Sequence, residues 1–216
     1  MNFVSDFDNA FRACPLIAIL RGVAPEEVED IGEALIAAGF RVIEVPLNSP
    51  RPFESIARLA SRFEGRAVVG AGTVITAREV EQVRDAGGQI VVSPHTDAEM
   101  IAATVAAGLV SLPGFATPSE AFAALRAGAS GLKLFPAEAS SPQALKALRT
   151  VLPEGTRLLP VGGIDGDTMG RWHAVGAAGF GIGSSLYKPG RSAEDIGERA
   201  RALIEAWDNL RDAQSQ

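Results

Sequence analysis

Eight short apolar runs, separated by longer segments of helical periodicity, constrain the fold of this chain more than any other feature. The runs lie at residues 16–20, 41–46, 67–70, 90–93, 109–112, 131–136, 158–161 and 179–183. The segments between them carry helix-start signals, such as the Thr-Pro-Ser-Glu capping box at residues 117–120. Parallel strands need helical crossovers, and eight of them close a sheet. The sequence therefore predicts an α/β fold: a (β/α)₈ TIM barrel.

One further amphipathic segment precedes the first apolar run. Residues 2–13 place Phe3, Phe7 and Phe11 on one helical face, which predicts an N-terminal helix capping one end of the barrel. No linker or low-complexity stretch divides the chain, so residues 1–216 are expected to form a single domain. The alternative fold is an open, doubly wound sheet, which would leave two edges to cover.

Composition excludes several classes of function. A net charge of -6 offers no basic footprint for nucleic acid. The sequence has neither a charged-then-apolar leader nor an apolar run of membrane length, so we expect a cytoplasmic protein with no membrane partner. Cys14 is the only cysteine and is expected in the core, and the two histidines stand far apart in sequence, which argues against a metal site.

Two charged residues lie inside the predicted strands rather than beyond them. Lys133 interrupts an apolar run, and Glu44 lies within the second strand. A desolvated lysine loses its proton more easily and becomes a nucleophile, while a desolvated carboxyl has a raised pKa suited to moving protons. Two structural alternatives stay open at this point. Lys133 could carry its charge out to the strand end, or the two residues could form a satisfied ion pair.

Glycine pairs lie at the ends of the last two predicted strands. Gly162 and Gly163 come after the seventh strand, and Gly181 and Gly183, followed by Ser184, end the eighth. Barrels commonly hold a phosphate at this position with glycine backbone amides and a short helix N-terminus. The two pairs together predict a site for a phosphorylated small molecule.

Other residues at the carboxyl ends of the strands have less specific interpretations. Arg21 ends the first strand and either binds a carboxylate through its guanidinium or pairs with a surface acid. His95 belongs either to the site or to a solvated loop. Trp172 and Trp207 lie on predicted helices and are expected to pack in the core.

Six motifs, in chain order, resemble the 2-keto-3-deoxy-6-phosphogluconate/phosphogalactonate aldolase family. They lie at residues 16–22, 44–50, 70–74, 133–137, 161–164 and 181–187. The resemblance spans nearly the whole chain. It implies a class I aldolase that needs no metal or other cofactor, that takes a phosphorylated keto-deoxy sugar acid and pyruvate, and that assembles as a homotrimer.

The resemblance also implies a role for each site residue. Lys133 corresponds to the Schiff-base lysine and Glu44 to the proton shuttle. Arg21 and Thr73 match positions that contact the substrate carboxylate end, and Pro94 matches a residue that shapes the surroundings of the lysine. The positions that match the phosphate site are Gly162, Gly163, Gly183 and Ser184.

One position departs from the gluconate enzymes of this family, in which an arginine follows the catalytic glutamate by four residues. Here that position is Asn48, within a Leu-Asn-Ser-Pro run typical of the galactonate branch. The preferred C4 epimer, or the use of both, is left open. Two alternatives from other classes are a sugar-phosphate isomerase or epimerase, with Glu44 as base and Lys133 as a charge, and a non-catalytic phosphosugar-binding barrel.

Overall fold

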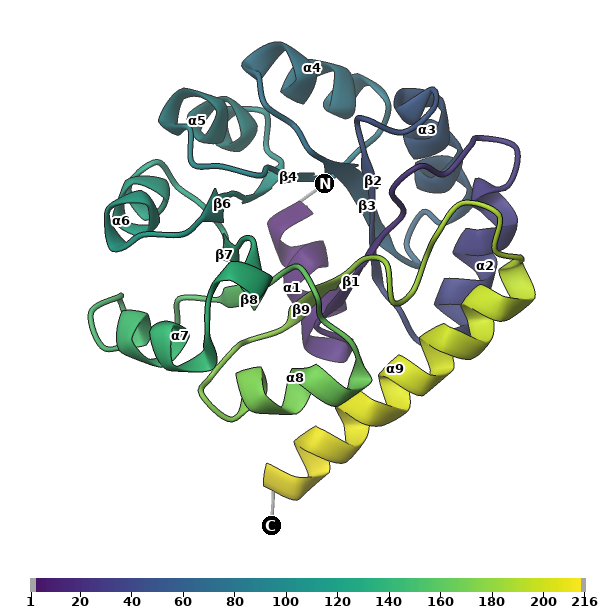
Figure 1. Ribbon diagram of the computed structural model, residues 1–216. Helices are drawn as coiled ribbons and strands as arrows, with labels where there is room; N and C mark the ends of the chain where they lie inside the picture. The colour runs from purple at the N-terminus through teal and green to yellow at the C-terminus, as the bar shows by residue number, and fades with distance from the viewer. Residues whose placement is uncertain (1–2, 215–216) are drawn as a thin grey trace.

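The computed structural model describes residues 3–214, and its strands form a ring enclosed by helices (Figure 1). In chain order the elements are α1 (Phe3–Ala13), β1 (Leu16–Ile19), α2 (Val28–Ala38), β2 (Val42–Pro46), α3 (Pro52–Arg62), β3 (Val68–Gly72), α4 (Ala77–Asp85), β4 (Ile90–Val92), α5 (Ala98–Ala106), β5 (Val110–Leu112), β6 (Gly114–Phe115), α6 (Pro118–Arg126), β7 (Leu132–Leu134), η1 (Ala137–Ala139), α7 (Pro142–Arg149), β8 (Leu158–Pro160), α8 (Gly166–His173), β9 (Phe180–Ile182) and α9 (Ala193–Gln214). The alternation confirms the predicted (β/α)₈ barrel.

All strand pairs are parallel, in the orders β5-β4-β3-β2-β1-β9 and β6-β7-β8. A bridge between Val161 and Gly181 joins β8 to β9. At the other junction, β5 and β6 are two halves of one barrel strand interrupted at Pro113. The prediction that the fifth strand ends at Leu112, before Pro113, is confirmed, but the short strand β6 that follows was not predicted. Proline lacks an N–H donor, but the Pro113 carbonyl still accepts from Lys133 N at 2.8 Å, so the strand resumes.

Two hydrophobic clusters follow from this arrangement, one between the strands and the outer helices and one inside the barrel. The inner cluster includes Phe7 and Phe11 of α1, whose rings stack 5.3 Å apart. Arg157, which precedes β8, pairs with Asp8 of the same helix at 2.7 Å. Helix α1 therefore closes the end of the barrel where the strands begin. This confirms the capping helix for the described residues, and Asn2 lies outside them.

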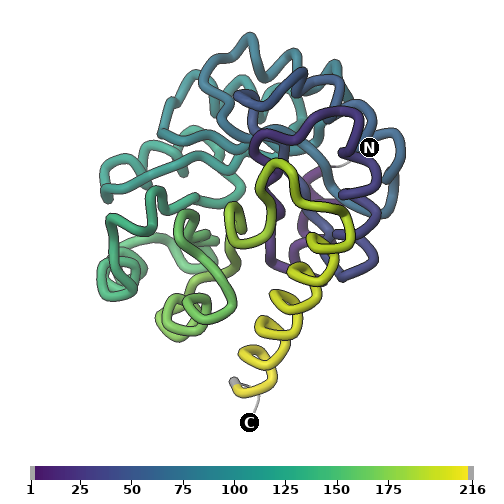
Figure 2. The backbone as a smooth tube through the Cα atoms, turned by 45° about the vertical axis from the view of Figure 1, so that its right-hand side comes forward, coloured from purple at the N-terminus to yellow at the C-terminus, as the bar shows by residue number. Residues whose placement is uncertain are grey.

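Several element boundaries differ from the prediction. Helix α2 begins at Val28 and not at residue 25, because the preceding residues form a turn in which Ala24 N donates to the Glu27 carboxylate at 3.1 Å. The 3₁₀ helix η1 was not predicted. Helix α9 continues to Gln214, six residues beyond the predicted end at residue 208, and it runs along the outside of the barrel toward the C-terminus (Figure 2).

The residues expected in the core are there. Cys14, Trp172 and Trp207 are buried, and burial raises the pKa of the Cys14 thiol to about 11, as for an inert structural cysteine. Across residues 3–214, no helix has both the length and the apolar character that crossing a bilayer requires.

Candidate active site

Lys133 and Glu44 lie on opposite sides of the barrel, because β7 and β2 are four positions apart around the ring. Both residues are almost fully buried, with Lys133 5% and Glu44 2% exposed. Both line the same small cavity inside the barrel, together with apolar side chains such as Val92 and Leu159. The two polar groups therefore face a shared, nearly dry space.

Burial dominates the ionisation of both groups. Loss of hydration raises the pKa of Glu44 to about 7, against the opposing effect of the Lys133 and Arg21 charges. The same loss of hydration lowers the pKa of Lys133, and Glu44 offsets part of this effect. The Lys133 amine also lies 4.6 Å from the centre of the Phe135 ring, a cation–π contact that opposes the effect of burial. Burial thus shifts both groups toward their neutral forms.

These observations decide between the alternatives for the two charges. A lysine that carried its charge into solvent would be more exposed than Lys133 is. In a satisfied ion pair both carboxylate oxygens would have partners, but Glu44 Oε2 has no hydrogen-bond partner. A buried oxygen without a partner is costly, and functional sites are where such groups are expected.

Gly72, at the end of the neighbouring strand β3, sets the position of the Glu44 carboxylate. A Cβ atom on Gly72 would lie 1.9 Å from Glu44 Oε2 and 2.5 Å from Oε1. The carboxylate therefore rests against bare backbone, in space that a side chain at residue 72 would fill. The sequence motif at residues 70–74 contains this glycine, but the contact itself could be found only in three dimensions.

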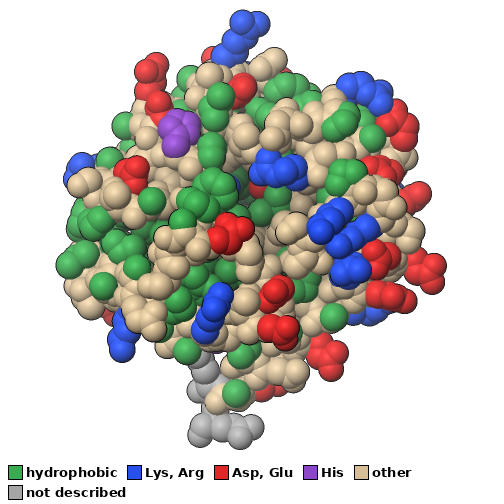
Figure 3. Space-filling view, viewed as in Figure 1, with side chains coloured by type: hydrophobic (Ala, Val, Ile, Leu, Met, Phe, Trp, Pro, Cys, Tyr) green, Lys and Arg blue, Asp and Glu red, His purple; other side chains and the backbone are tan. Residues whose placement is uncertain are grey.

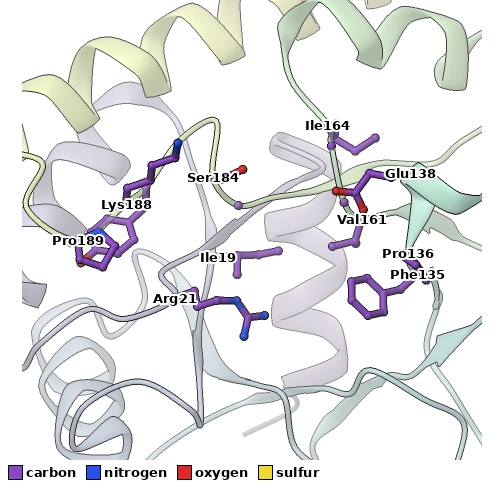
Figure 4. Close-up of a pocket in the computed structure, with 14 residues that line it drawn as sticks. Ile19, Arg21, Phe135, Pro136, Glu138, Val161, Ile164, Ser184, Lys188 and Pro189 are labelled. Atoms are coloured by element: carbon purple, nitrogen blue, oxygen red, sulfur yellow. The ribbon is translucent and has the colours of Figure 1, made fainter.

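Above the inner cavity, a larger cavity of about 550 Å³ opens at the carboxyl ends of the strands (Figure 4). The two cavities share Ile19 and Val161. Figure 4 shows Arg21 and Phe135 pointing into the larger space from opposite sides. On the molecular surface, a hollow with hydrophobic walls lies near the middle of the ring (Figure 3). We call the larger space the mouth cavity.

The mouth cavity brings together five of the nine predicted site residues: Arg21, Gly162, Gly163, Gly183 and Ser184. Lys133 and Glu44 lie below it, in the inner cavity. Thr73 and Pro94 border neither cavity. The other nine residues that line the mouth cavity were not predicted as site residues; they include Phe135, Glu138, Tyr187, Lys188 and Pro189. Of these residues, only Lys188 could have been identified from the sequence, because it is a positive charge close after Gly183.

The two glycine loops present free backbone donors. Gly162 and Gly163 adopt φ values of 111° and 63°, which suit glycine and few other residues. Within residues 3–214, the N–H groups of Gly163 and Ser184 donate no hydrogen bond. The loops are tied together, because Ser185 Oγ donates to Ile164 O at 2.8 Å. Free N–H groups on two joined loops can accommodate an anion.

The Glu138 side chain lies against the same loops. A Cβ atom on Gly162 would lie 2.4 Å from Glu138 Oε2, so this carboxylate rests on the loop backbone. Figure 4 shows Glu138 beside Val161 at the edge of the cavity. An acidic group at this position places a negative charge near the free donors.

The remaining predicted residues differ in their surroundings. The Arg21 guanidinium donates to Asn48 Oδ1 at 2.9 Å, so Arg21 pairs with a neutral amide rather than a surface acid. Thr73 has a φ of 57°, a strained conformation for a β-branched residue. Pro94 packs against Gly114, where a Cβ atom would lie 2.4 Å from the Pro94 carbonyl. His95 is exposed, and its carbonyl accepts from Ser93 Oγ at 2.6 Å.

Among the described side chains, no group of three or more His, Cys, Asp or Glu residues is arranged to hold a metal ion. The chemistry that the site itself offers is that of an amine and a carboxyl group.

A barrel with a buried amine facing a buried carboxyl, below loops that can hold an anion, defines a class of enzymes that act on carbonyl compounds. Comparison with known proteins makes the assignment specific. The sequence model of the family "KDPG and KHG aldolase" matches residues 7–199, and the chain belongs to this family. It is therefore an aldolase, a carbon–carbon lyase.

Two curated relatives cover most of the chain. A probable 2-dehydro-3-deoxy-6-phosphogalactonate aldolase of Rhizobium meliloti (strain 1021) is 47% identical over 90% of this chain and 92% of its own length. The 2-dehydro-3-deoxy-6-phosphogalactonate aldolase of Escherichia coli (strain K12) is 42% identical over 89% of this chain and 94% of its own length.

Solved structures agree with the fold. A structure described as native KDPGal superposes with a TM-score of 0.90 at 41% identity, covering 92% of this chain and 96% of that one. The KDPG aldolase of Legionella pneumophila, captured with pyruvate as a covalent carbinolamine intermediate, has a TM-score of 0.77 at 29% identity, covering 94% of this chain and 98% of that one.

Proposed function

We propose that the protein cleaves 2-dehydro-3-deoxy-6-phosphogalactonate to pyruvate and glyceraldehyde 3-phosphate through a Schiff base on Lys133. The observation that carries the proposal is the burial of Lys133 opposite a Glu44 carboxyl whose pKa is raised to about 7. The choice of substrate follows the two curated relatives, whose names specify the phosphogalactonate. The covalent intermediate described for the Legionella enzyme supports the reaction type.

The reaction begins when neutral Lys133 Nζ attacks the C2 ketone. Glu44 protonates the C2 oxygen as it leaves as water, and the iminium that forms withdraws electrons from C3. Glu44, now ionised, accepts the proton of the C4 hydroxyl directly or through a water. The C3–C4 bond breaks, glyceraldehyde 3-phosphate departs, and the electron pair remains on the enamine.

The second half releases pyruvate. The enamine takes a proton at C3, and water adds to the resulting iminium to return the free amine. A carboxyl group that serves in both directions must gain and lose a proton at the working pH. The raised pKa of Glu44, about 7, suits this requirement.

The ends of the substrate bind at opposite parts of the site in this proposal. Arg21 and Thr73 hold the carboxylate end, and Pro94 shapes the surroundings of the lysine. The phosphate binds the free backbone N–H groups, with the nearby Lys188 as a cation. The phosphate loops are Gly162, Gly163, Gly183 and Ser184.

Assembly and location belong to the same proposal. We propose that single-domain barrels assemble as a homotrimer, as the family resemblance implies, and that they act in the cytoplasm. Sedimentation equilibrium of the purified protein tests the trimer, because a monomer of 22.5 kDa and its trimer differ threefold in mass.

Borohydride trapping with pyruvate tests the nucleophile. The chain has three lysines, Lys133, Lys146 and Lys188, so peptide mapping can assign the reduced adduct without ambiguity. We expect the adduct on Lys133 alone. Lys133→Ala should abolish it, and Lys146→Ala, on the outer helix α7, is the matched control that should retain it. A reducible adduct in the Lys133→Ala protein would refute the assignment.

Cleavage of the two C4 epimers, measured side by side, tests the substrate. We expect the phosphogalactonate to have the higher kcat/KM. A higher kcat/KM for the phosphogluconate would assign the protein to the phosphogluconate aldolases, and the proposed role of Lys133 would stay the same.

A further inference from the structure

Arg191 lies behind one of the two glycine loops and makes an unusual set of contacts. Its guanidinium Nη1 donates to three successive backbone carbonyls, those of Ser184 at 3.3 Å, Ser185 at 3.4 Å and Leu186 at 2.8 Å. The side chain is only 18% exposed, and it also pairs with Asp195 at 3.6 Å. An arginine committed to carbonyls in this way fixes the orientation of the peptide units that it contacts.

Those peptide units form a single turn with free donors at one end. Leu186 N and Tyr187 N both donate to Gly183 O at 2.9 Å, which closes the turn. Within the described chain, the N–H groups of Ser184 and Ser185 have no acceptor. The N–H of Ser185 belongs to the same planar peptide unit as the Ser184 carbonyl, and the two point in opposite directions. Arg191 holds the carbonyl end of the turn, so the free N–H end points away from it.

The position of Arg191 relative to the cavities agrees with this orientation. It lines a neighbouring cavity of about 530 Å³ that shares Gly163, Ile164, Ser184 and Lys188 with the mouth cavity. Arg191 itself does not line the mouth cavity. It therefore acts on the loop from behind and not as a direct ligand of anything bound in the mouth cavity.

We propose that Arg191 is a positioning residue for the phosphate site, which it pre-forms by holding the three carbonyls of residues 184–186. This inference rests on the proposed function. The guanidinium directs Nη1 to the carbonyls while its Nε faces Asp195 at 3.6 Å. A lysine has one nitrogen, one bond closer to the backbone, and cannot make both sets of contacts. Pre-formed donors bind an anion better than donors that must first be ordered.

The test compares Arg191→Ala and Arg191→Lys with a matched control, Arg199→Ala. Arg199 lines the same neighbouring cavity and bonds the same Asp195, at 3.0 Å, but it contacts no loop carbonyl. Two measurements separate positioning from general damage. One is the affinity for inorganic phosphate by calorimetry. The other is the exchange of pyruvate methyl protons in D₂O, which needs the amine and carboxyl but no phosphate.

We expect both Arg191 variants to bind inorganic phosphate about 10-fold more weakly, in the range of losing one hydrogen bond to a charged group. Their kcat/KM for the phosphorylated substrate should fall by a similar factor, while pyruvate exchange stays within about twofold of wild type. Arg199→Ala should match wild type in all three assays.

Three results would overturn the inference. The first is unchanged phosphate affinity in both variants. The second is a parallel loss of pyruvate exchange, which would make Arg191 a general structural residue. The third is normal binding by Arg191→Lys, which would reduce its role to charge. Failure of the wild-type protein to exchange pyruvate would count against the proposed function instead, and phosphate affinity would still decide the role of Arg191.

Discussion

Replacing Gly72 with alanine tests the geometry of the Glu44 carboxyl without touching its chemistry. The added Cβ would lie 1.9 Å from Glu44 Oε2 and 2.4 Å from its carboxyl carbon. Non-bonded heavy atoms rest about 3.5 Å apart, so the carboxyl must retreat by more than about 1 Å. The inner cavity beside it has only about 10 Å³ of free space, so the retreat cannot be accommodated without displacing the carboxyl from its working position.

The expected cost follows from that displacement. A misplacement of about 1 Å in a reacting group costs about 100-fold in rate, which corresponds to about 2.7 kcal/mol of transition-state stabilisation. We expect Gly72→Ala to lower kcat by about that factor, while Lys133 still forms a reducible adduct with pyruvate. A coupled assay for pyruvate release measures the rate, and borohydride trapping measures the adduct.

A double mutant isolates the cause. In a Glu44→Ala background there is no carboxyl to displace, so adding Gly72→Ala should lower kcat no further. Gly70→Ala, in the same strand, is the contrasting variant. Its Cβ would meet the Ile90 backbone oxygen at 2.0 Å, so it should lower the free energy of unfolding as well as the activity. The reasoning is refuted if Gly72→Ala changes the kcat of wild type by less than twofold. It is also refuted if Gly72→Ala lowers the kcat of the Glu44→Ala protein by as large a factor as it lowers the kcat of wild type.

Three further predictions concern ionisation and the phosphate. The pKa of the Glu44 carboxyl rises from 4.5 to about 7 on folding, so folding stability is lost as pH rises between these values. Urea denaturation should therefore show that the free energy of unfolding of Glu44→Gln, relative to that of wild type, increases by up to about 3 kcal/mol between pH 4.5 and pH 8. A difference between the two proteins that does not change with pH would contradict this. The kcat/KM of wild type should fall with increasing pH above about 7, as measured by initial rates, because the reaction begins with the protonated Glu44 carboxyl, and Glu44→Gln should lose that inflection. Removing the substrate phosphate should lower kcat/KM steeply, because remote binding energy orients the reacting carbon, and equal rates on both substrates would exclude this role.

The sequence was sufficient for the architecture because the barrel depends on repeated local signals. Each strand is a short apolar run, and each helix has its own start and end residues, as at the Thr117 capping box. The charges inside strands were equally visible. Lys133 and Glu44 differ from their apolar neighbours in sequence, and alternation alone places the ends of all strands at one mouth.

What the sequence could not supply depends on contacts between distant segments. The continuation of the barrel strand past Pro113 depends on a bond to Lys133 N in the next strand. Arg21 meets Asn48 across 27 residues of chain, and Glu138 rests on Gly162 in another loop. The strained φ of Thr73 likewise has no local sequence signal. Each of these features depends on the folded structure, and no hydrophobic periodicity in the sequence predicts it.

A single physical cause accounts for both halves of the active pair. Removal of water raises the pKa of the Glu44 carboxyl and lowers that of the Lys133 amine, so each shift moves its group toward neutrality. An exposed pair would instead remain a charged carboxylate and ammonium at neutral pH, with no nucleophile and no acid. The cap that α1 places over the far end of the barrel, with Phe7 fully buried there, closes one route by which water could reach the pair. The reactivity of Lys133 and Glu44 thus depends on the packing of α1 at the opposite end of the barrel. Burying these two ionisable groups lowers the folding stability of the protein, and the same burial makes them reactive.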